Sequence, residues 1–157
     1  MGRVYTINLT PAAATVALDL VEITPADDKP VLVHGFRVWQ TSDLGDAAEE
    51  EITISWVRGN TTSGSGGNTS VTAPPKLRNS AATAMTVETG NTTPASSGTP
   101  VTVYSTGWNV RGPLEITLTP EQRFDASQAD TLLCLRMGAA PADSLTIGCS
   151  IDVEEIC

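Results

Sequence analysis

His34 is the only histidine in this 157-residue chain, so any catalytic arrangement that needs an imidazole base must use it. Serine and cysteine nucleophiles are commonly activated by such a base. Val33 and Gly35 flank His34, and Leu32 and Phe36 lie two residues away on its own side of an expected strand. This setting favours a hydrogen-bonded strand residue near the edge of a core. We therefore expect no catalytic residue and no enzymatic activity, and His34 is the last candidate base for the residual enzyme hypothesis.

Two glycines resemble part of a phosphate-binding loop. Gly59 and Gly64 have the spacing of its two glycines and follow an expected strand. Ser65, however, stands where the lysine of that loop is required, and no helix is expected after it. Because a run of small residues produces glycine spacings freely, we expect neither a bound nucleotide nor any other cofactor.

An acidic cluster is the one segment whose composition suits a metal ion. It consists of Asp43, Asp46, Glu49, Glu50 and Glu51. Oxygen-rich clusters bind calcium, but this spacing matches no EF-hand loop. A pair of carboxylates can also hydrolyse glycosides when a cleft holds them about 5 to 10 Å apart, a separation that the sequence does not give. We interpret the cluster as a solvated acidic turn and expect no metal site, with a calcium ion at a subunit interface as the alternative.

Charge and apolar content restrict the partners. Lys plus Arg total 9 against 18 for Asp plus Glu, which gives a formal net charge of -9. Binding to a phosphate backbone depends on positive side chains, so we expect no nucleic-acid partner.

The chain contains no apolar run of 18 residues and no apolar segment near residue 1, so we expect neither membrane insertion nor secretion but assembly in a reducing cytoplasm. Cys134, Cys149 and Cys157 are accordingly expected to be free thiols.

Alternation of apolar and polar residues is the dominant pattern, and it predicts β-strands. The clearest example places Leu145, Ile147, Cys149, Ile151 and Val153 on one face. Alternation predicts strands at Tyr5 to Leu9, Leu114 to Thr119, and Leu145 to Glu154. Five further strands are expected where the chain is rich in Val, Ile, Leu, Thr or Trp and bounded by Gly, Pro, Asn or Asp: Thr15 to Thr24, Val31 to Thr41, Glu50 to Arg58, Val101 to Trp108, and Thr131 to Met137.

About eight strands in one domain of this length indicate an all-β fold: an antiparallel two-sheet β-sandwich of the jelly-roll kind. In Thr15 to Thr24 the apolar set slips by one residue, from Val16, Leu18 and Leu20 to Val21 and Ile23. Such a slip predicts a β-bulge or a strand that changes sheets. No helical periodicity is sustained, and only Asp43 to Glu51 is expected to form a short helical turn.

A long segment rich in Thr, Ser, Gly, Asn, Ala and Pro, residues 58–100, interrupts the strands. Loops longer than about 12 to 15 residues are usually functional or disordered. We therefore expect a polar loop or arm that reaches a partner.

The three tryptophans differ in their expected positions. Trp56 shares a face with Ile52 and Ile54 and is expected in the core. Trp108 precedes a turn and could lie in the core or serve as a contact. Trp39 shares a face with apolar residues and also with a charged one, so the sequence does not decide whether its ring lies in the core.

Several segments together resemble a family of small virion structural proteins from tailed bacteriophages and prophages. They are Leu20 to Pro30, Arg58 to Gly67, Asn91 to Thr93, Asn109 to Arg111, and Ala139 to Ser144. These segments span nearly the whole chain in order, and they include no catalytic motif.

The resemblance implies a head decoration or cementing protein, which binds the assembled shell and bridges neighbouring subunits. The implied partners are the major capsid protein and two further copies of the chain in a homotrimer, on the outer capsid surface of the virion. The expected contact residues are Arg58, Asn60, Thr61, Thr62, Asn91, Thr92, Trp108, Asn109 and Arg111. The alternative is a carbohydrate- or receptor-binding jelly-roll module of a phage tail or head fibre, with Trp108 at the contact.

Overall fold

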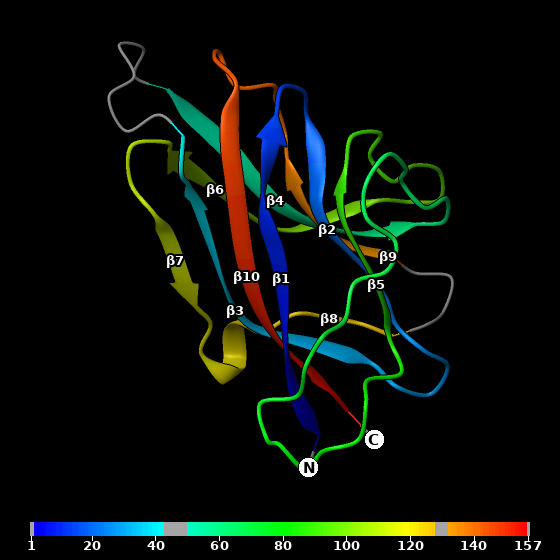
Figure 1. Cartoon of the computed structure of the whole chain (residues 1–157). Coiled ribbons are helices and arrows are strands. Elements are labelled where there is room, and N and C mark those ends of the chain that lie inside the picture. The colour runs from blue at the N-terminus through cyan, green and yellow to red at the C-terminus, as the bar shows by residue number, and fades with distance from the viewer. Residues whose placement is uncertain (1, 43–49, 128–131, 157) are drawn as a thin grey trace.

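The computed structural model describes residues 2–42, 50–127 and 132–156, and these residues form two antiparallel sheets that face each other (Figure 1). The strands are β1 (Arg3–Ala14), β2 (Leu18–Thr24), β3 (Val31–Gln40), β4 (Glu51–Asn60), β5 (Thr86–Asn91), β6 (Val101–Asn109), β7 (Leu114–Thr117), β8 (Asp125–Ala126), β9 (Leu132–Met137) and β10 (Leu145–Glu155). A single turn of 3-10 helix covers Pro120–Gln122. No helix among these residues is long and apolar enough to cross a membrane.

The order of the strands is that of a jelly roll. One sheet, here called the β10 sheet, runs β1-β10-β3-β7, with the short β8 also paired to β3. The other, the β9 sheet, runs β5-β2-β9-β4-β6. When β5 and β8 are set aside, each sheet keeps four strands, and the chain passes repeatedly from one sheet to the other. The expected all-β, two-sheet antiparallel sandwich is confirmed.

All eight strands predicted from the sequence are present, with ends shifted by a few residues. The two additional strands are β5, which lies within the Thr/Ser/Gly-rich segment, and the two-residue β8. The helical turn expected at 43–51 and most of the acidic cluster lie outside the described residues. Glu51 is the first residue of β4.

The core fills the space between the sheets, because alternate residues of each strand point inward. On β10 the inward residues Leu145, Ile147, Cys149, Ile151 and Val153 are all at most 1% exposed. Trp56, from the β9 sheet, meets Phe36, from the β10 sheet, edge-to-face at 5.8 Å between ring centroids. The core position expected for Trp56 is confirmed, and this ring pair joins the two sheets.

A β-bulge in β2 has a large effect on where side chains point. The pairing of β2 with β9 shifts register between Asp19 and Val21, so Leu20 is the extra residue. In a regular strand, residues 19 and 22 would point to opposite faces. With the bulge, Leu20 and Val21 are both fully buried in the core, and Asp19 and Glu22 share the outer face of the β9 sheet. The slip read from the sequence is confirmed as a bulge.

Residues 58–100 fold onto the sandwich. Isolated bridges join Thr62 to Ser96, Ser65 to Thr93, and Asn68 to Thr89, so two parts of the segment pair with each other. Its middle part contributes Ala73, Met85 and Val87 to the core. Figure 1 shows these residues, in green, as loops beside β5 and β9 and along the side of the molecule.

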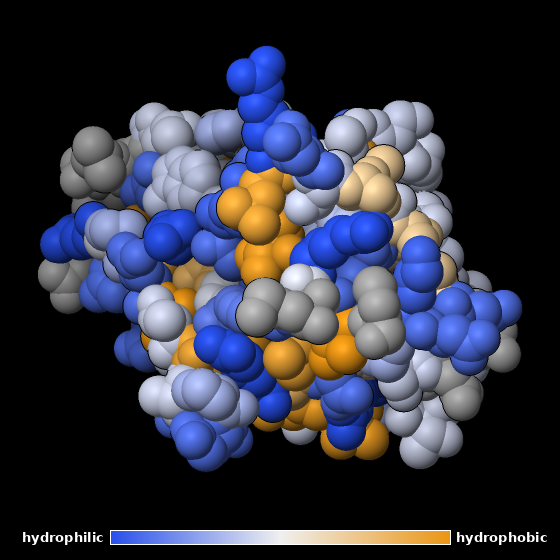
Figure 2. Space-filling view, turned by 90° about the horizontal axis from the view of Figure 1, so that it is seen from below, coloured by the Kyte–Doolittle hydropathy of each residue, from blue (hydrophilic) through white to orange (hydrophobic). Residues whose placement is uncertain are grey.

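Both chain ends lie on one end of the sandwich, because Arg3 of β1 pairs with Glu155 of β10 (Figure 1). Figure 2 looks onto this end and shows apolar residues among hydrophilic ones. Leu77 and Ile156, which are 74% and 40% exposed, belong to the segments on either side of the start of β1. This end therefore carries exposed apolar surface.

Candidate functional site

Three buried carboxylates hold the long Thr/Ser/Gly-rich segment in place. Asp19, Glu22 and Glu155 are at most 2% exposed. Each accepts hydrogen bonds from the backbone of that segment. A carboxylate is expensive to bury unless donors surround it, so these three positions indicate where the segment is most firmly fixed.

Asp19 is held by an arginine and by one backbone amide. Arg136, its cross-strand neighbour on β9, donates from Nε to Oδ1 at 2.6 Å and from Nη2 to Oδ2 at 3.0 Å. The amide of Ala95 also donates to Oδ2, at 2.7 Å, and Arg136 Nη2 donates to the carbonyl of Ala95 at 2.8 Å. The ion pair thus binds both backbone groups of a single residue in the loop after β5.

Glu22 fixes the other half of the same loop region. Ser63 Oγ donates to Oε1 at 2.6 Å, the Gly64 amide donates to Oε2 at 2.9 Å, and Asn91 Nδ2 donates to Oε2 at 3.1 Å. Residues 61–70 and 92–99 are therefore both anchored on the outer face of the β9 sheet, and we call these two segments the covering layer. The layer gives the molecule a partial third layer beyond the two sheets.

Glu155 anchors the segment at the end of the molecule where the termini lie. The amides of Ala84 and Met85 both donate to its Oε1 at 2.7 Å, and the hydroxyl of Thr83 donates to the same atom. Nearby, Tyr5 Oη donates to the carbonyl of Ala81 at 3.1 Å. The chain is thus fixed just before it enters β5.

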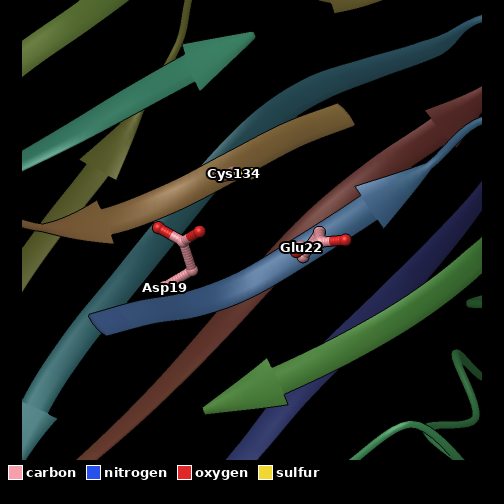
Figure 3. Close-up of side chains that lie close together, drawn as sticks. All are labelled: Asp19, Glu22 and Cys134. Carbon is pink, nitrogen blue, oxygen red and sulfur yellow. The ribbon is translucent and has the colours of Figure 1, made fainter. Parts of the chain in front are cut away.

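Asp19, Glu22 and Cys134 also meet the geometric requirement for a metal site. One potential ligand atom from each lies within 4.8 Å of the others, and all three residues are buried. In Figure 3, Asp19 and Glu22 extend from β2, beside β9, which carries Cys134. Burial, followed by the negative charges of Asp19 and Glu22, raises the pKa of the Cys134 thiol, whereas a metal binds the thiolate.

The carboxylates of this trio are already occupied. Every oxygen of Asp19 and Glu22 accepts at least one hydrogen bond, and the cation beside them is the guanidinium of Arg136. A metal ion would have to displace these donors and approach a fixed positive charge. The arrangement fits a polar anchor for the covering layer better than it fits a metal centre.

The covering layer carries no charge. Residues 59–75 and 89–110 contain no Asp, Glu, Lys, Arg or His, although the chain as a whole has a net charge of -9. The two stretches are also joined in space, since Thr99 donates its amide to the carbonyl of Gly59 and Thr61 donates to that of Ser96. The second stretch continues into β6, an edge strand of the β9 sheet. Together they make a hydroxyl- and amide-rich region, and at its far end the carboxylate of Glu51, from β4, lies over Gly107 of β6.

A groove of about 610 Å³ lies between the covering layer and β1. Asn8, Thr10 and Ala12 of β1 line one side, and Gly66 to Thr72 with Thr89 to Thr92 supply residues of the other. None of the lining residues is charged. The groove can therefore offer hydrogen bonds from amides, hydroxyls and backbone, but no ion pair.

His34 lies on the outer face of the β10 sheet, away from this surface. Its Nε2 is 2.7 Å from Glu154 Oε2, and both side chains are about one-fifth exposed. The hollow beside it, also lined by Arg37 and Asp152, has a volume of only about 90 Å³. The hydrogen-bonded strand position expected for this histidine is what the structure shows.

The expected contact residues fall into two groups at opposite ends of β4. Glu51, at the start of β4, pairs with Asn109, whereas Arg58, near its end, pairs with Val101. The group near the covering layer contains Arg58, Asn60, Thr61, Thr62, Asn91 and Thr92; the group at the β6–β7 turn contains Trp108, Asn109 and Arg111. A single small partner site would not include both groups.

Within the first group, exposure separates contact residues from anchors. Thr61, Thr62 and Thr92 are exposed, and Thr92 lines the groove. Asn60 and Asn91 are at most 1% exposed, so a partner would not reach them. Arg58 donates from Nη1 to the carbonyl of Asp125 at 2.8 Å and to its carboxylate at 2.9 Å.

In the second group, Trp108 is a core residue. It is 1% exposed, and its Nε1 donates to the carbonyl of Gly112 at 2.7 Å, which also closes the turn. Its ring is therefore not presented to a partner or to a sugar. Asn109 and Arg111 are exposed at this turn.

Sequence reasoning did not identify Asp19, Glu22 or Glu155 as anchors. The available signal was two acidic residues inside the apolar strand Leu18 to Thr24, since a charge in a buried strand needs a partner. Cys134 and Cys149 are free and buried, as expected, and Cys157 lies outside the described residues.

Fold and site together define a jelly-roll β-sandwich with an uncharged covering layer over one sheet. No protein-family model matches the chain, and no curated protein matches its sequence.

Proposed function

We propose that this protein is a structural component of a bacteriophage virion, and specifically a capsid decoration or cementing protein that binds the assembled head and bridges neighbouring subunits. The observation that supports the proposal is the uncharged covering layer, which continues into the start of β6. Depletion of charged residues is the compositional mark of the centre of a protein–protein interface. The resemblance to small virion proteins supplies the kind of partner, which is the major capsid protein.

The anchoring of the covering layer supports the same role. A loop that is ordered before it binds does not lose conformational entropy on binding, so more of the contact energy appears as affinity. Here Asp19 and Glu22 hold the layer through charge-assisted hydrogen bonds. The exposed Thr61, Thr62 and Thr92 can then contact a shell without first being ordered.

A trimeric state would increase the apparent affinity. Each copy could make a weak contact, and linking three such contacts raises the overall binding strength without any single strong site. The exposed Leu77 and Ile156, at the end of the molecule with both termini, provide apolar surface suited to a contact between copies. The protein would act on the outer capsid surface after synthesis in the bacterial cytoplasm, and it would need no catalytic residue.

One observation favours the carbohydrate-binding alternative. Trp39 lies on the outer face of the β10 sheet over Gly148, where an added Cβ would come within 2.8 Å of the indole ring. The side chain is only partly buried, and a flat aromatic surface of this kind can stack on a sugar ring. Under this alternative the parent protein binds a glycan array and a Trp39→Ala variant loses that binding. Under the decoration role the Trp39→Ala variant binds shells as the parent does.

The test of the proposal is binding to shells assembled without the protein. Light scattering gives the mass of the free protein, and co-sedimentation with such shells gives the bound ratio. We expect trimers that saturate the shells at a fixed ratio. A protein that stays in the supernatant at all concentrations would contradict the decoration role.

The contact surface is tested with matched variants. Thr61→Lys combined with Thr62→Lys puts two charges on the covering layer and should weaken co-sedimentation at least about tenfold, because a buried unpaired charge is costly. Thr61→Ser combined with Thr62→Ser keeps the hydroxyls and should bind as the parent does. Thr117→Lys, on the other sheet, controls for an added charge.

A further inference from the structure

We infer that the open edge of β1 at Asn8 accepts an extended, uncharged strand from another protein, which under the proposed function is the shell protein. The inference rests on the proposed function only for the identity of that donor. The hydrogen bonding of β1, the position of Pro74 and the groove beside them define the acceptor edge.

The edge of β1 that faces away from β10 is hydrogen-bonded along only part of its length. Near the start of the strand the Thr6 amide donates to the carbonyl of Pro74 at 3.0 Å, and the Lys76 amide donates to the carbonyl of Val4 at 2.8 Å. These bonds show that even-numbered residues of β1 direct their backbone groups away from β10, toward the open edge. Asn8 therefore directs its amide and carbonyl the same way, and among the described residues neither has a backbone partner there.

Pro74 explains why the pairing stops. In an antiparallel ladder the residue that accepts from Thr6 should also donate to the Thr6 carbonyl, but proline has no N–H. The next pair along this ladder would join Asn8 to Thr72, and no hydrogen bond joins them. The chain instead moves away from β1, and the groove opens where the ladder would have continued.

The groove determines the chemistry of the incoming strand. Its lining has no charged residue, so a strand with charged side chains would leave them unpaired. Gly66, Gly67 and Gly90 lie in its wall. Gly66 and Gly67 pack directly against Thr92, Thr89 and Asn91, so the wall is formed by closely packed backbone and hydroxyl groups rather than by long side chains. A smaller apolar hollow of about 30 Å³ adjoins it, lined in part by Leu9 and Ala13, and is large enough only for a small side chain. These features favour a strand of Thr, Ser, Val and Ala.

A second copy of this chain is a poor donor of that strand. Among the described residues, every extended segment is already paired in a sheet or anchored to the sandwich. The strand is therefore supplied by a different protein. Adding a strand to an exposed edge is a common way to bind an extended peptide, with backbone bonds giving affinity and pockets giving specificity.

The first test uses a defined probe, a blocked hexapeptide of alternating valine and threonine. We expect saturable binding by fluorescence anisotropy, and no binding of the same peptide with lysine in place of threonine. Asn8→Pro removes the outward amide and should weaken binding about five- to tenfold. Asn8→Ala keeps that amide and is the matched control, so equal loss in both variants would overturn the inference.

The second test uses the parent protein, so it does not require any variant to fold. Hydrogen exchange of the parent protein is followed by mass spectrometry over residues 5–13, free and bound to shells assembled without it. Strand addition should slow exchange of the Asn8 amide about tenfold or more, whereas the Thr6 amide is already bonded and should change little. Shell binding with unchanged exchange at Asn8 would overturn the strand inference and leave the decoration role intact. Peptide binding without shell binding would support the acceptor edge and contradict the decoration role.

Discussion

At the scale of single residues, the stability of this protein depends on a few buried charges. Asp19 and Arg136 form a bidentate pair in which the carboxylate is fully buried and the arginine partly so. Such a pair contributes little compared with an apolar replacement of both partners, but the loss of one partner leaves a buried charge uncompensated. In the Arg37–Glu115 pair, in contrast, both side chains are exposed to solvent.

Asp19→Asn should therefore destabilise the fold strongly. We expect a loss of about 3 kcal/mol in the free energy of unfolding, measured by urea denaturation, because Arg136 keeps its charge without a carboxylate. Arg37→Met removes a partner of the exposed pair and should leave the urea midpoint unchanged within error. Equal effects of the two substitutions would contradict the role given to burial.

Cys149 gives the molecule a pH dependence of stability. Burial raises the pKa of its thiol to about 12, from 9.0. Between these values the unfolded chain loses a proton that the folded chain keeps, so stability is full below pH 9 and falls as pH rises. The decrease should be about 1.4 kcal/mol per pH unit for this thiol.

The measurement is the free energy of unfolding at several pH values between 8 and about 10, in a Cys157→Ser background. Cys149→Ala should make the slope shallower, whatever its effect on absolute stability. Cys134 is also buried with a raised pKa, so part of the slope should remain. A slope unchanged by Cys149→Ala would show that this thiol is not responsible.

At the scale of elements, the bulge in β2 connects the sheet to the covering layer. The extra residue, Leu20, turns Asp19 and Glu22 to one face, and both then anchor backbone amides of the loops. Without the bulge one of the two carboxylates would point into the core. The covering layer thus depends on one irregularity in a single strand.

Glu22→Gln tests that dependence. The amide group cannot accept from Ser63, Gly64 and Asn91 as a carboxylate does, so residues 61–70 should exchange amide hydrogen about tenfold faster while the sheets remain folded. Glu88→Gln is the matched control, because Glu88 accepts from Asn91 on the same strand. Loss of the whole fold in Glu22→Gln, or equal exchange in both variants, would contradict a local anchoring role.

The elements show what the sequence could and could not predict. Strands such as Leu145 to Glu155 follow strict alternation, and local pattern is enough to place them. β5 was missed because Thr86 to Asn91 looks like the small polar residues around it and becomes a strand only by pairing with β2. The anchors were missed for a similar reason, since the partners of Glu22 lie 41 and 69 residues away.

At the scale of the whole molecule, the two sheets and the long segment share one core. Phe36 of the β10 sheet packs against Trp56 of the β9 sheet and against Tyr104 of β6. Ala73 and Met85, from the segment between β4 and β5, join the same cluster. A smaller cluster of Ala95, Leu132 and Cys134 lies under the covering layer. Because both sheets contribute to the main core, the described residues should unfold together.

A single transition is therefore expected. Urea unfolding curves followed by far-UV circular dichroism and by tryptophan fluorescence should coincide. Phe36→Ala should lower the free energy of unfolding by about 3 to 5 kcal/mol and shift both curves equally. Separate transitions for the two signals would show that one sheet is stable without the other.

The pairing of β1 with β10 also sets the order in which the chain can fold. Among the described strands β1 comes first and β10 last, and Arg3 pairs with Glu155, 152 residues further along the chain. During synthesis β1 therefore lacks its main partner until the ribosome has made all the described strands that lie between the two. Closing so long a loop slows folding and leaves unpaired strand edges exposed in the meantime. A circular permutant that joins residue 156 to residue 2 through a short linker would make this pairing local, and it should fold faster than the parent with the same final structure.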